Sequence, residues 1–164
     1  MRLTLAIAMT LAAGAAAAQE ALAPEELAGF AAEICLTGTA EMAAEPDTGD
    51  FELVERGDEI ARYVHPTGVA LALAARPGFF SCEIEVREAD EAYFDILITE
   101  FGERFLATFE ADGFEQVEDG LVWQARTEAG TLVTTEAQQD EAGRITLTSS
   151  TETTVADEAP RDQN

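Results

Sequence analysis

Lysine is absent from this sequence of 164 residues, and the nine basic residues are all arginine. The 33 Asp and Glu residues outnumber them, so the formal net charge is -24 at pH 7. A field of this sign repels phosphate backbones and anionic lipid headgroups, which argues against nucleic-acid binding and against docking of the folded protein on a membrane. The hydrophobic content of 47% is enough for a packed core, so we expect a folded, soluble, acidic protein.

Histidine and cysteine are scarce, with one His and two Cys in the whole chain. A zinc site needs a cluster of His and Cys ligands that this sequence does not have. His65 would have to serve any Ser-His-Asp arrangement, but it lies in a His-Pro-Thr-Gly turn signal and no Gly-x-Ser-x-Gly motif is present. Neither standard Gly-rich phosphate loop occurs. We therefore predict no catalytic residue and no cofactor.

Carboxylates are so abundant that no pair stands out as an acid–base couple. Glu83 and Glu85 share one face of an expected strand, where solvated side chains are typical. Calcium is the one metal that the composition permits, because it takes oxygen ligands. The two most oxygen-rich loops, 47–50 and 110–115, lack the EF-hand spacing and are typical of turns and caps, so we predict no metal site.

A long apolar run occurs only at the N-terminus, over residues 3–18, and it is shorter than the roughly 20 residues that span a bilayer. Arg2 precedes the run, and small residues end it at Ala18, before Gln19. This layout predicts a signal peptide at residues 1–18, cleaved between Ala18 and Gln19, and a product in the periplasm or secreted. The alternative is a retained membrane anchor. Cleavage would remove one arginine and none of the 33 acids.

The two cysteines fit an exported protein. Cys35 and Cys82 are the only thiols, and an oxidising compartment favours their pairing as an intramolecular disulfide. The alternative is a redox-active or nucleophilic cysteine, but the chain has no Cys-x-x-Cys pair to support it.

A helix is expected from Pro24, with Leu27, Phe30, Ile34 and Cys35 on its apolar stripe. It ends either at Gly38 or just before Pro46. Short apolar runs separated by turn residues then predict an antiparallel meander, in which Cys82 lies on the buried face of the last strand. The four expected strands are Phe51–Glu55, Ile60–His65, Val69–Ala75 and Phe79–Arg87.

The second half has the same order of elements. A helix capped by Asp90 is expected to run to about Ala111, with an aromatic stripe that includes Phe101 and Phe105. Four more strands follow, and residues 155–164 form a flexible acidic tail. We therefore predict an α+β fold, with two helices packed on antiparallel sheet. The expected strands are Phe114–Glu118, Leu121–Arg126, Thr131–Ala137 and Arg144–Thr151.

The two halves also match in sequence. Residues 51–57 and 114–120 are identical at five of seven positions. This suggests a tandem repeat of a helix plus a four-stranded meander, with units at 19–88 and 89–154. The alternative is coincidence in a Glu-rich chain.

One stretch, residues 60–82, contains no Asp or Glu, and its run from Val69 to Ala75 is apolar on both faces of the expected strand. Either another element covers the second face of this strand, or the strand forms a contact surface for a partner or a second copy. The candidate surface residues are Val69, Leu71, Leu73 and Arg76.

These observations favour an exported, non-catalytic interaction or binding protein. Two alternatives stay open: a small enzyme that uses carboxylates, and a low-affinity cation-binding protein.

Overall fold

The computed structural model describes residues 21–41, 46–109, 115–117, 120–127 and 130–152. The expected signal peptide at 1–18, its cleavage point at Ala18 and Gln19, and the acidic tail at 155–164 lie outside these residues. No helix in the described part of the chain is long and apolar enough to cross a membrane.

The first helical segment consists of α1 (Pro24–Ala31), a π-helical turn η1 (Ala32–Leu36) and α2 (Thr37–Glu41). The helix therefore continues through Gly38. This glycine has a packing role, because a Cβ atom there would lie 2.7 Å from the ring of Phe80. Gly38 allows the helix to approach the sheet closely.

The second helix, α3 (Glu91–Phe109), begins at the predicted cap. The Asp90 carboxylate accepts a hydrogen bond of 2.8 Å from the backbone N–H of Tyr93. Leu97, Phe101 and Phe105 are fully buried, so the predicted aromatic stripe is the packing face of α3.

All eight predicted strands are present, and each end lies within two residues of its expected position. They form one antiparallel sheet in the order β1-β2-β3-β4-β8-β7-β6-β5. The strands are β1 (Glu52–Arg56), β2 (Ile60–Val64), β3 (Ala70–Arg76), β4 (Phe79–Val86), β5 (Glu115–Val117), β6 (Gly120–Arg126), β7 (Leu132–Gln139) and β8 (Ile145–Glu152).

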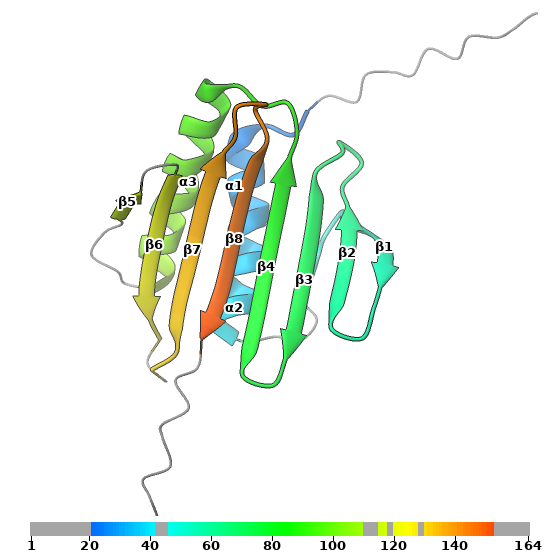
Figure 1. Ribbon diagram of the computed structural model, residues 1–164, viewed down its shortest axis with the longest axis vertical. Helices are drawn as coiled ribbons and strands as arrows, with labels where there is room; N and C mark the ends of the chain where they lie inside the picture. Colours follow the sequence, from blue (N-terminus) through cyan, green and yellow to red (C-terminus); the bar gives the residue numbers. More distant parts are fainter. Residues whose placement is uncertain (1–20, 42–45, 110–114, 118–119, 128–129, 153–164) are drawn as a thin grey trace, which may run out of the picture.

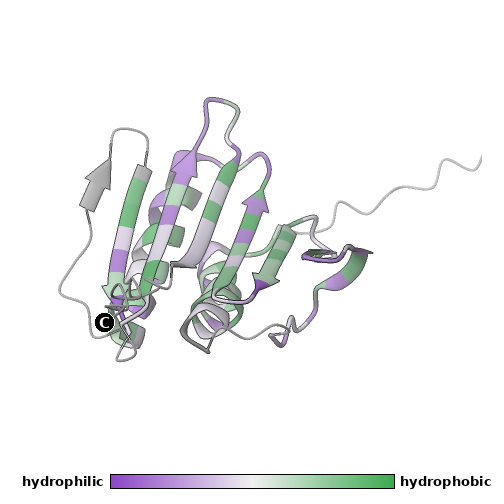
Figure 2. Cartoon of the chain, turned by 60° about the horizontal axis from the view of Figure 1, so that its bottom comes forward, coloured by the Kyte–Doolittle hydropathy of each residue, from purple (hydrophilic) through white to green (hydrophobic). Residues whose placement is uncertain are grey.

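Both helical segments lie on the same side of the sheet, which confirms the α+β class (Figure 1). Polar and apolar residues alternate along the strands (Figure 2), as expected when one face of a sheet is buried. On β4, Phe80, Cys82 and Ile84 are buried under the helices, whereas Glu83 is exposed. The core therefore occupies the space between the helices and one face of the sheet.

The two halves of the chain share this sheet. Each half contributes a helical segment and four strands, and β4 of the first half pairs with β8 of the second. The two halves are thus joined by backbone hydrogen bonds. From each edge of the sheet to its centre, the four strands of one half follow in chain order. The tandem repeat of the two halves stays a prediction.

The predicted disulfide is confirmed. Cys35 in η1 is bonded to Cys82 in β4, with their Cα atoms 5.3 Å apart. It ties the first helical segment to the sheet that the segment covers, and no cysteine in the structure is free.

Candidate functional site

The side of the sheet opposite the helices, which we call the open face, carries no helix of the described chain (Figure 1). Alternation along each strand determines which side chains lie on it. From β2 across to β6 they are Ile60, Arg62, Val64, Ala70, Ala72, Ala74, Arg76, Phe79, Ser81, Glu83, Glu85, Thr146, Thr148, Ser150, Leu132, Thr134, Glu136, Gln138, Val122, Gln124 and Arg126.

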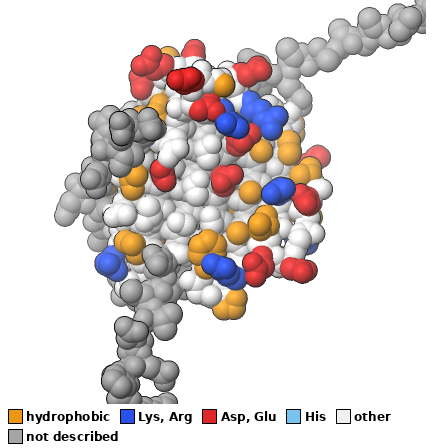
Figure 3. All heavy atoms as spheres, viewed as in Figure 1, with side chains coloured by type: hydrophobic (Ala, Val, Ile, Leu, Met, Phe, Trp, Pro, Cys, Tyr) orange, Lys and Arg blue, Asp and Glu red, His pale blue; other side chains and the backbone are white. Residues whose placement is uncertain are grey.

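The centre of the open face is formed largely by small side chains. Ala72 and Ala74 of β3 lie beside Ser81 and Glu83 of β4, and Ser150 of β8 continues the surface. Such short side chains leave the sheet surface low and accessible. A space-filling view of this face shows mostly backbone and side chains that are neither charged nor hydrophobic at its centre (Figure 3).

An apolar band runs along β2 and β3 on the same face. Ile60 and Val64 are 45% and 36% exposed, and they pair with Ala74 and Ala70. We call these residues, together with Ala72, the β2–β3 band. The acid-free stretch of the sequence forms this band, because it encodes both strands.

The structure corrects the expected partner surface on β3. Leu71 and Leu73 are 1% and 4% exposed and Val69 is also buried, because their side chains point toward the helices. They belong to the core and cannot offer a surface to a partner. Arg76 is exposed and lies on the open face, with its guanidinium 4.6 Å from the centre of the Phe79 ring. The surface that β3 presents consists instead of its alanines.

Arginines gather on the sheet side of the molecule. The described helices contain one, Arg104, whereas Arg62, Arg76 and Arg126 lie on the open face. The helical side is correspondingly acidic, and its exposed or half-exposed carboxylates are Glu25, Glu26, Glu33, Glu91, Asp95, Glu100 and Glu103.

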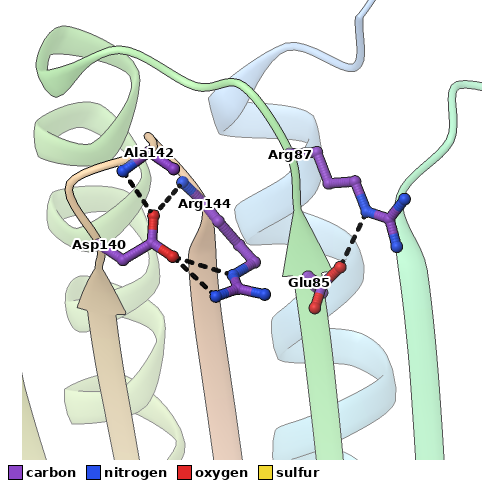
Figure 4. A network of polar contacts seen from close by, with 5 residues as sticks. All are labelled: Glu85, Arg87, Asp140, Ala142 and Arg144. Atoms are coloured by element: carbon purple, nitrogen blue, oxygen red, sulfur yellow. Dashed lines mark hydrogen bonds and ion pairs between the residues drawn. The ribbon is translucent and has the colours of Figure 1, made fainter.

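Two more arginines lie at one end of the open face (Figure 4). The Arg144 guanidinium donates two hydrogen bonds to Asp140, of 3.0 and 2.8 Å, and the Arg87 guanidinium donates one of 3.0 Å to Glu85. The Asp140 carboxylate also accepts hydrogen bonds from the backbone N–H groups of Arg144 and Ala142. These contacts hold the pKa of Asp140 below its usual range. Arg62 is paired in the same way with Glu55 of β1, at 3.1 Å. Three acids near the margin of the face, Glu55, Glu85 and Asp140, are therefore each paired with an arginine.

The two central acids are not matched. Glu83 of β4 is opposite Thr148 of β8, which is opposite Glu136 of β7. No ion pair with arginine involves Glu83 or Glu136 in the described structure, where Glu136 only accepts a hydrogen bond from the amide of Gln138. Acidic side chains isolated among uncharged ones are visible in the middle of this face (Figure 3).

The open face is hollowed at the end where Arg144 lies. The groove at this end has a volume of ≈ 510 Å³. Its lining includes Glu83, Glu85, Asp140 and Arg144. Glu85 and Asp140 already bind arginines, whereas in the described structure no ion pair with arginine involves Glu83 or Glu141, which also line the groove.

A second cavity, of ≈ 410 Å³, lies near the start of the first helix and is lined in part by Leu22, Val69, Val86 and Tyr93. The Tyr93 hydroxyl donates a hydrogen bond of 2.9 Å to the Leu22 carbonyl. Burial, with a smaller contribution from the charge of Glu25, raises the pKa of Tyr93 to about 12. This tyrosine therefore stays protonated at neutral pH and serves to fix the segment before α1.

His65 lies in the predicted turn, which is closed by a hydrogen bond from Gly68 N–H to the His65 carbonyl. Its ring is buried against Phe30 and Phe51, and its Nδ1 atom is 2.8 Å from the Thr67 hydroxyl. These contacts are those of a structural histidine that anchors the turn.

Within the described ranges, no three His, Cys, Asp or Glu side chains are grouped to hold a metal ion. In the loop at 47–50, Asp47 accepts the backbone N–H of Gly49, which is the geometry of a turn. The other oxygen-rich loop lies mostly outside the described residues.

The fold thus defines an α+β protein with two helical segments on one face of an eight-stranded antiparallel sheet and an uncovered second face. Comparison with known protein families, with curated proteins and with solved structures finds no match to this chain.

Part of this site can be predicted from the sequence. Alternation along β4 already placed Glu83 on the exposed face, and the acid-free stretch pointed to β2 and β3. The row of Glu83, Thr148 and Glu136 could not be predicted, because it depends on pairing between β4 and β8, which are distant in the sequence.

Proposed function

We propose that this protein is an exported, non-catalytic binding protein that docks a partner protein on the open face of its sheet. The observation that carries the proposal is the composition of that face: small side chains with two acids, Glu83 and Glu136, at the centre, the apolar β2–β3 band to one side, and several arginines. Protein interfaces combine apolar and polar surface in this way, and arginine is enriched in them.

The size of the face supports this function. The surface from β2 to β6 spans six strands about 4.8 Å apart and about 20 Å along each strand, or roughly 500 Å². Stable complexes bury about 800 Å² on each partner. The open face alone is smaller than this, which is the size range of weak or transient complexes.

The groove beside Arg144 is the best location for an enzyme of the carboxylate type, because four carboxylates and an arginine line it. Two of these carboxylates are held in place by other contacts, which favours binding instead. Asp140 is fixed by four hydrogen bonds and its pKa is lowered, so it is a poor proton donor near neutral pH. Glu85 is likewise held by Arg87.

Affinity capture from a native periplasmic fraction tests the proposal. The baits are the wild-type protein, Ala72→Arg on the open face, and Ala107→Arg on the exposed side of α3 as a control that makes the same chemical change. We expect one protein to be captured by the wild type and by Ala107→Arg but not by Ala72→Arg. Equal capture by all three folded baits would contradict docking on the open face.

A further inference from the structure

We infer that the docked partner adds an extended strand to β1, at the edge of the sheet beside the open face. β1 is the first strand in the sheet order, and no strand of the described chain pairs with its outer side. This inference rests on the proposed function, because it states how the partner continues beyond the open face.

The outer side of β1 is accessible along its whole length. All five residues of β1 are exposed, and the β1–β2 hairpin lies to one side of both helical segments (Figure 1). An edge strand presents backbone N–H and C=O groups that point away from its neighbour in the sheet. The ligand that satisfies a row of such groups is another backbone in the extended conformation. The opposite edge, β5, has only three residues for such pairing.

Exposed apolar side chains are concentrated on the same hairpin. The described chain exposes five large hydrophobic residues, and all of them except Ile96 lie on β1 and β2. Val54 is the most exposed of the five, at 61%. Single apolar residues on a surface need no explanation, but a cluster of them marks a contact with another molecule. The four residues of the hairpin are Leu53, Val54, Ile60 and Val64.

β1 contains a bulge with an apolar side chain. The register with β2 shifts between Leu53 and Glu55, which leaves Val54 without an opposite residue on β2. Bulges and charged side chains commonly protect an edge strand from pairing with other chains. Here the extra residue is an exposed valine beside the exposed Leu53, and burial of both under another strand is favourable.

The apolar side chains lie on both sides of the hairpin. Leu53 is opposite the buried Tyr63 and therefore lies on the helical side, whereas Ile60 and Val64 lie on the open face. An added strand has alternate side chains on the two sides, so it covers Leu53 while the body of the partner covers Ile60 and Val64. The open face alone is smaller than the roughly 800 Å² of a stable interface, and the added strand enlarges the contact.

Charge argues against a second copy as the source of this strand. Each β1 contains two glutamates and one arginine, so two β1 strands side by side have an excess of like charge. Each chain also has a formal charge of -24, and two copies repel each other before their edges meet. The added strand therefore belongs to a different protein.

The capped peptide acetyl-Arg-Thr-Val-Thr-Val-Thr-Arg-amide is a suitable probe of strand addition. It is titrated at millimolar concentration into ¹⁵N-labelled, disulfide-bonded protein, and amide shifts and amide hydrogen exchange are followed by NMR. We expect shifts on β1 and slower exchange of those β1 amides that point outward. The same peptide with N-methyl groups on all its central amides keeps the charge but cannot pair as a strand, so it should leave exchange on β1 unchanged.

Leu53→Ser tests the side-chain contact. Ile96→Ser on α3 is the matched control, because Leu53 and Ile96 are 47% and 40% exposed. We expect Leu53→Ser to weaken the apparent affinity for the peptide about threefold to tenfold, and Ile96→Ser to weaken it less than about twofold. Amide spectra away from each substitution show whether the variants are folded.

Several outcomes would overturn the inference. Equal slowing of exchange by the N-methylated peptide would mean that backbone pairing is not the cause, and the absence of any change on β1 would reject the edge as an acceptor of strands. Equal effects of the two serine variants would reject the contact with Leu53. Self-association of the protein through β1 without peptide would assign the edge to a second copy. The capture experiment with Ala72→Arg tests docking on the open face, so the two proposals can fail separately.

Discussion

The backbone N–H of Ala89 donates a hydrogen bond of 2.9 Å to the carbonyl of Gly143. This contact fixes the β7–β8 turn against the connection between β4 and α3, and Gln139 adds a second bond from its amide to the Ala89 carbonyl. The turn that carries Asp140 and Arg144 is therefore anchored to the β4–α3 connection.

Gly143→Ala tests this contact. Gly143 has a φ of 75°, and a Cβ atom there would lie 2.5 Å from the Ala89 carbonyl oxygen. Gly78 has the same φ but nothing within 4 Å of the added atom, so Gly78→Ala is the matched control. We expect Gly78→Ala to cost about 1 kcal/mol in free energy of unfolding and Gly143→Ala to cost at least about 2 kcal/mol. Equal losses in denaturant unfolding would rule out the steric contact.

The two glycines of the first helical segment should respond in opposite directions. Gly29 has open space around an added Cβ atom, so Gly29→Ala should stabilise the protein by about 0.5–1 kcal/mol through helix propensity. Gly38→Ala should destabilise it by about 1–3 kcal/mol, because the methyl group meets the buried Phe80 ring. Thermal unfolding of both variants measures the difference. A stabilised Gly38→Ala variant would mean that the helix does not approach β4 so closely.

Removing the disulfide should cost more than any of these changes. The bridge closes a loop with a sequence separation of 47, for which the chain-entropy account gives about 4 kcal/mol. We expect Cys35→Ala/Cys82→Ala to unfold at lower denaturant concentration than the wild type, with no further effect of reductant. A variant as stable as the oxidised wild type would contradict a structural role for the bridge.

The ion pair of Asp140 predicts a pH-dependent contribution to stability. Because the pKa of Asp140 is lowered in the folded protein, its contribution is present above the unfolded pKa of about 4 and is lost as pH falls through the lower, folded value. Asp140→Asn should therefore be less stable than the wild type at pH 7, and the difference should shrink below about pH 4. The measurement is urea unfolding across this pH range. A difference that is constant with pH would mean that the lost hydrogen bonds, and not the charge, account for the effect.

Most of the fold could be predicted because the residues that local patterns place on one face of a helix or strand are the residues that the structure buries. Alternation on β4 and helical spacing around Cys35 placed both cysteines in the core, and the structure joins them. The sequence does not decide where the first helix ends, because glycine at position 38 favours helix termination. The close packing of Gly38 against Phe80 explains why a glycine lies inside the helix.

The candidate site was less accessible to sequence reasoning. Val69, Leu71 and Leu73 are predicted surface residues because they are apolar, and in the folded chain that property places them in the core. The residues of β3 that do lie on the open face, such as Ala72, are small, and their type alone does not indicate a binding surface. Pairing between strands from different halves of the chain brings Glu83 and Glu136 into one row, and no local pattern reports that pairing.

The most direct test of docking on the open face is the dissociation constant of the captured partner, measured by calorimetry with purified proteins. Ala72→Arg places a long charged side chain at the centre of the face, whereas Ala107→Arg places it on α3. We predict that Ala72→Arg weakens binding at least about tenfold, or 1.4 kcal/mol, while Ala107→Arg binds like the wild type. Wild-type affinity in a correctly folded Ala72→Arg variant would contradict the account.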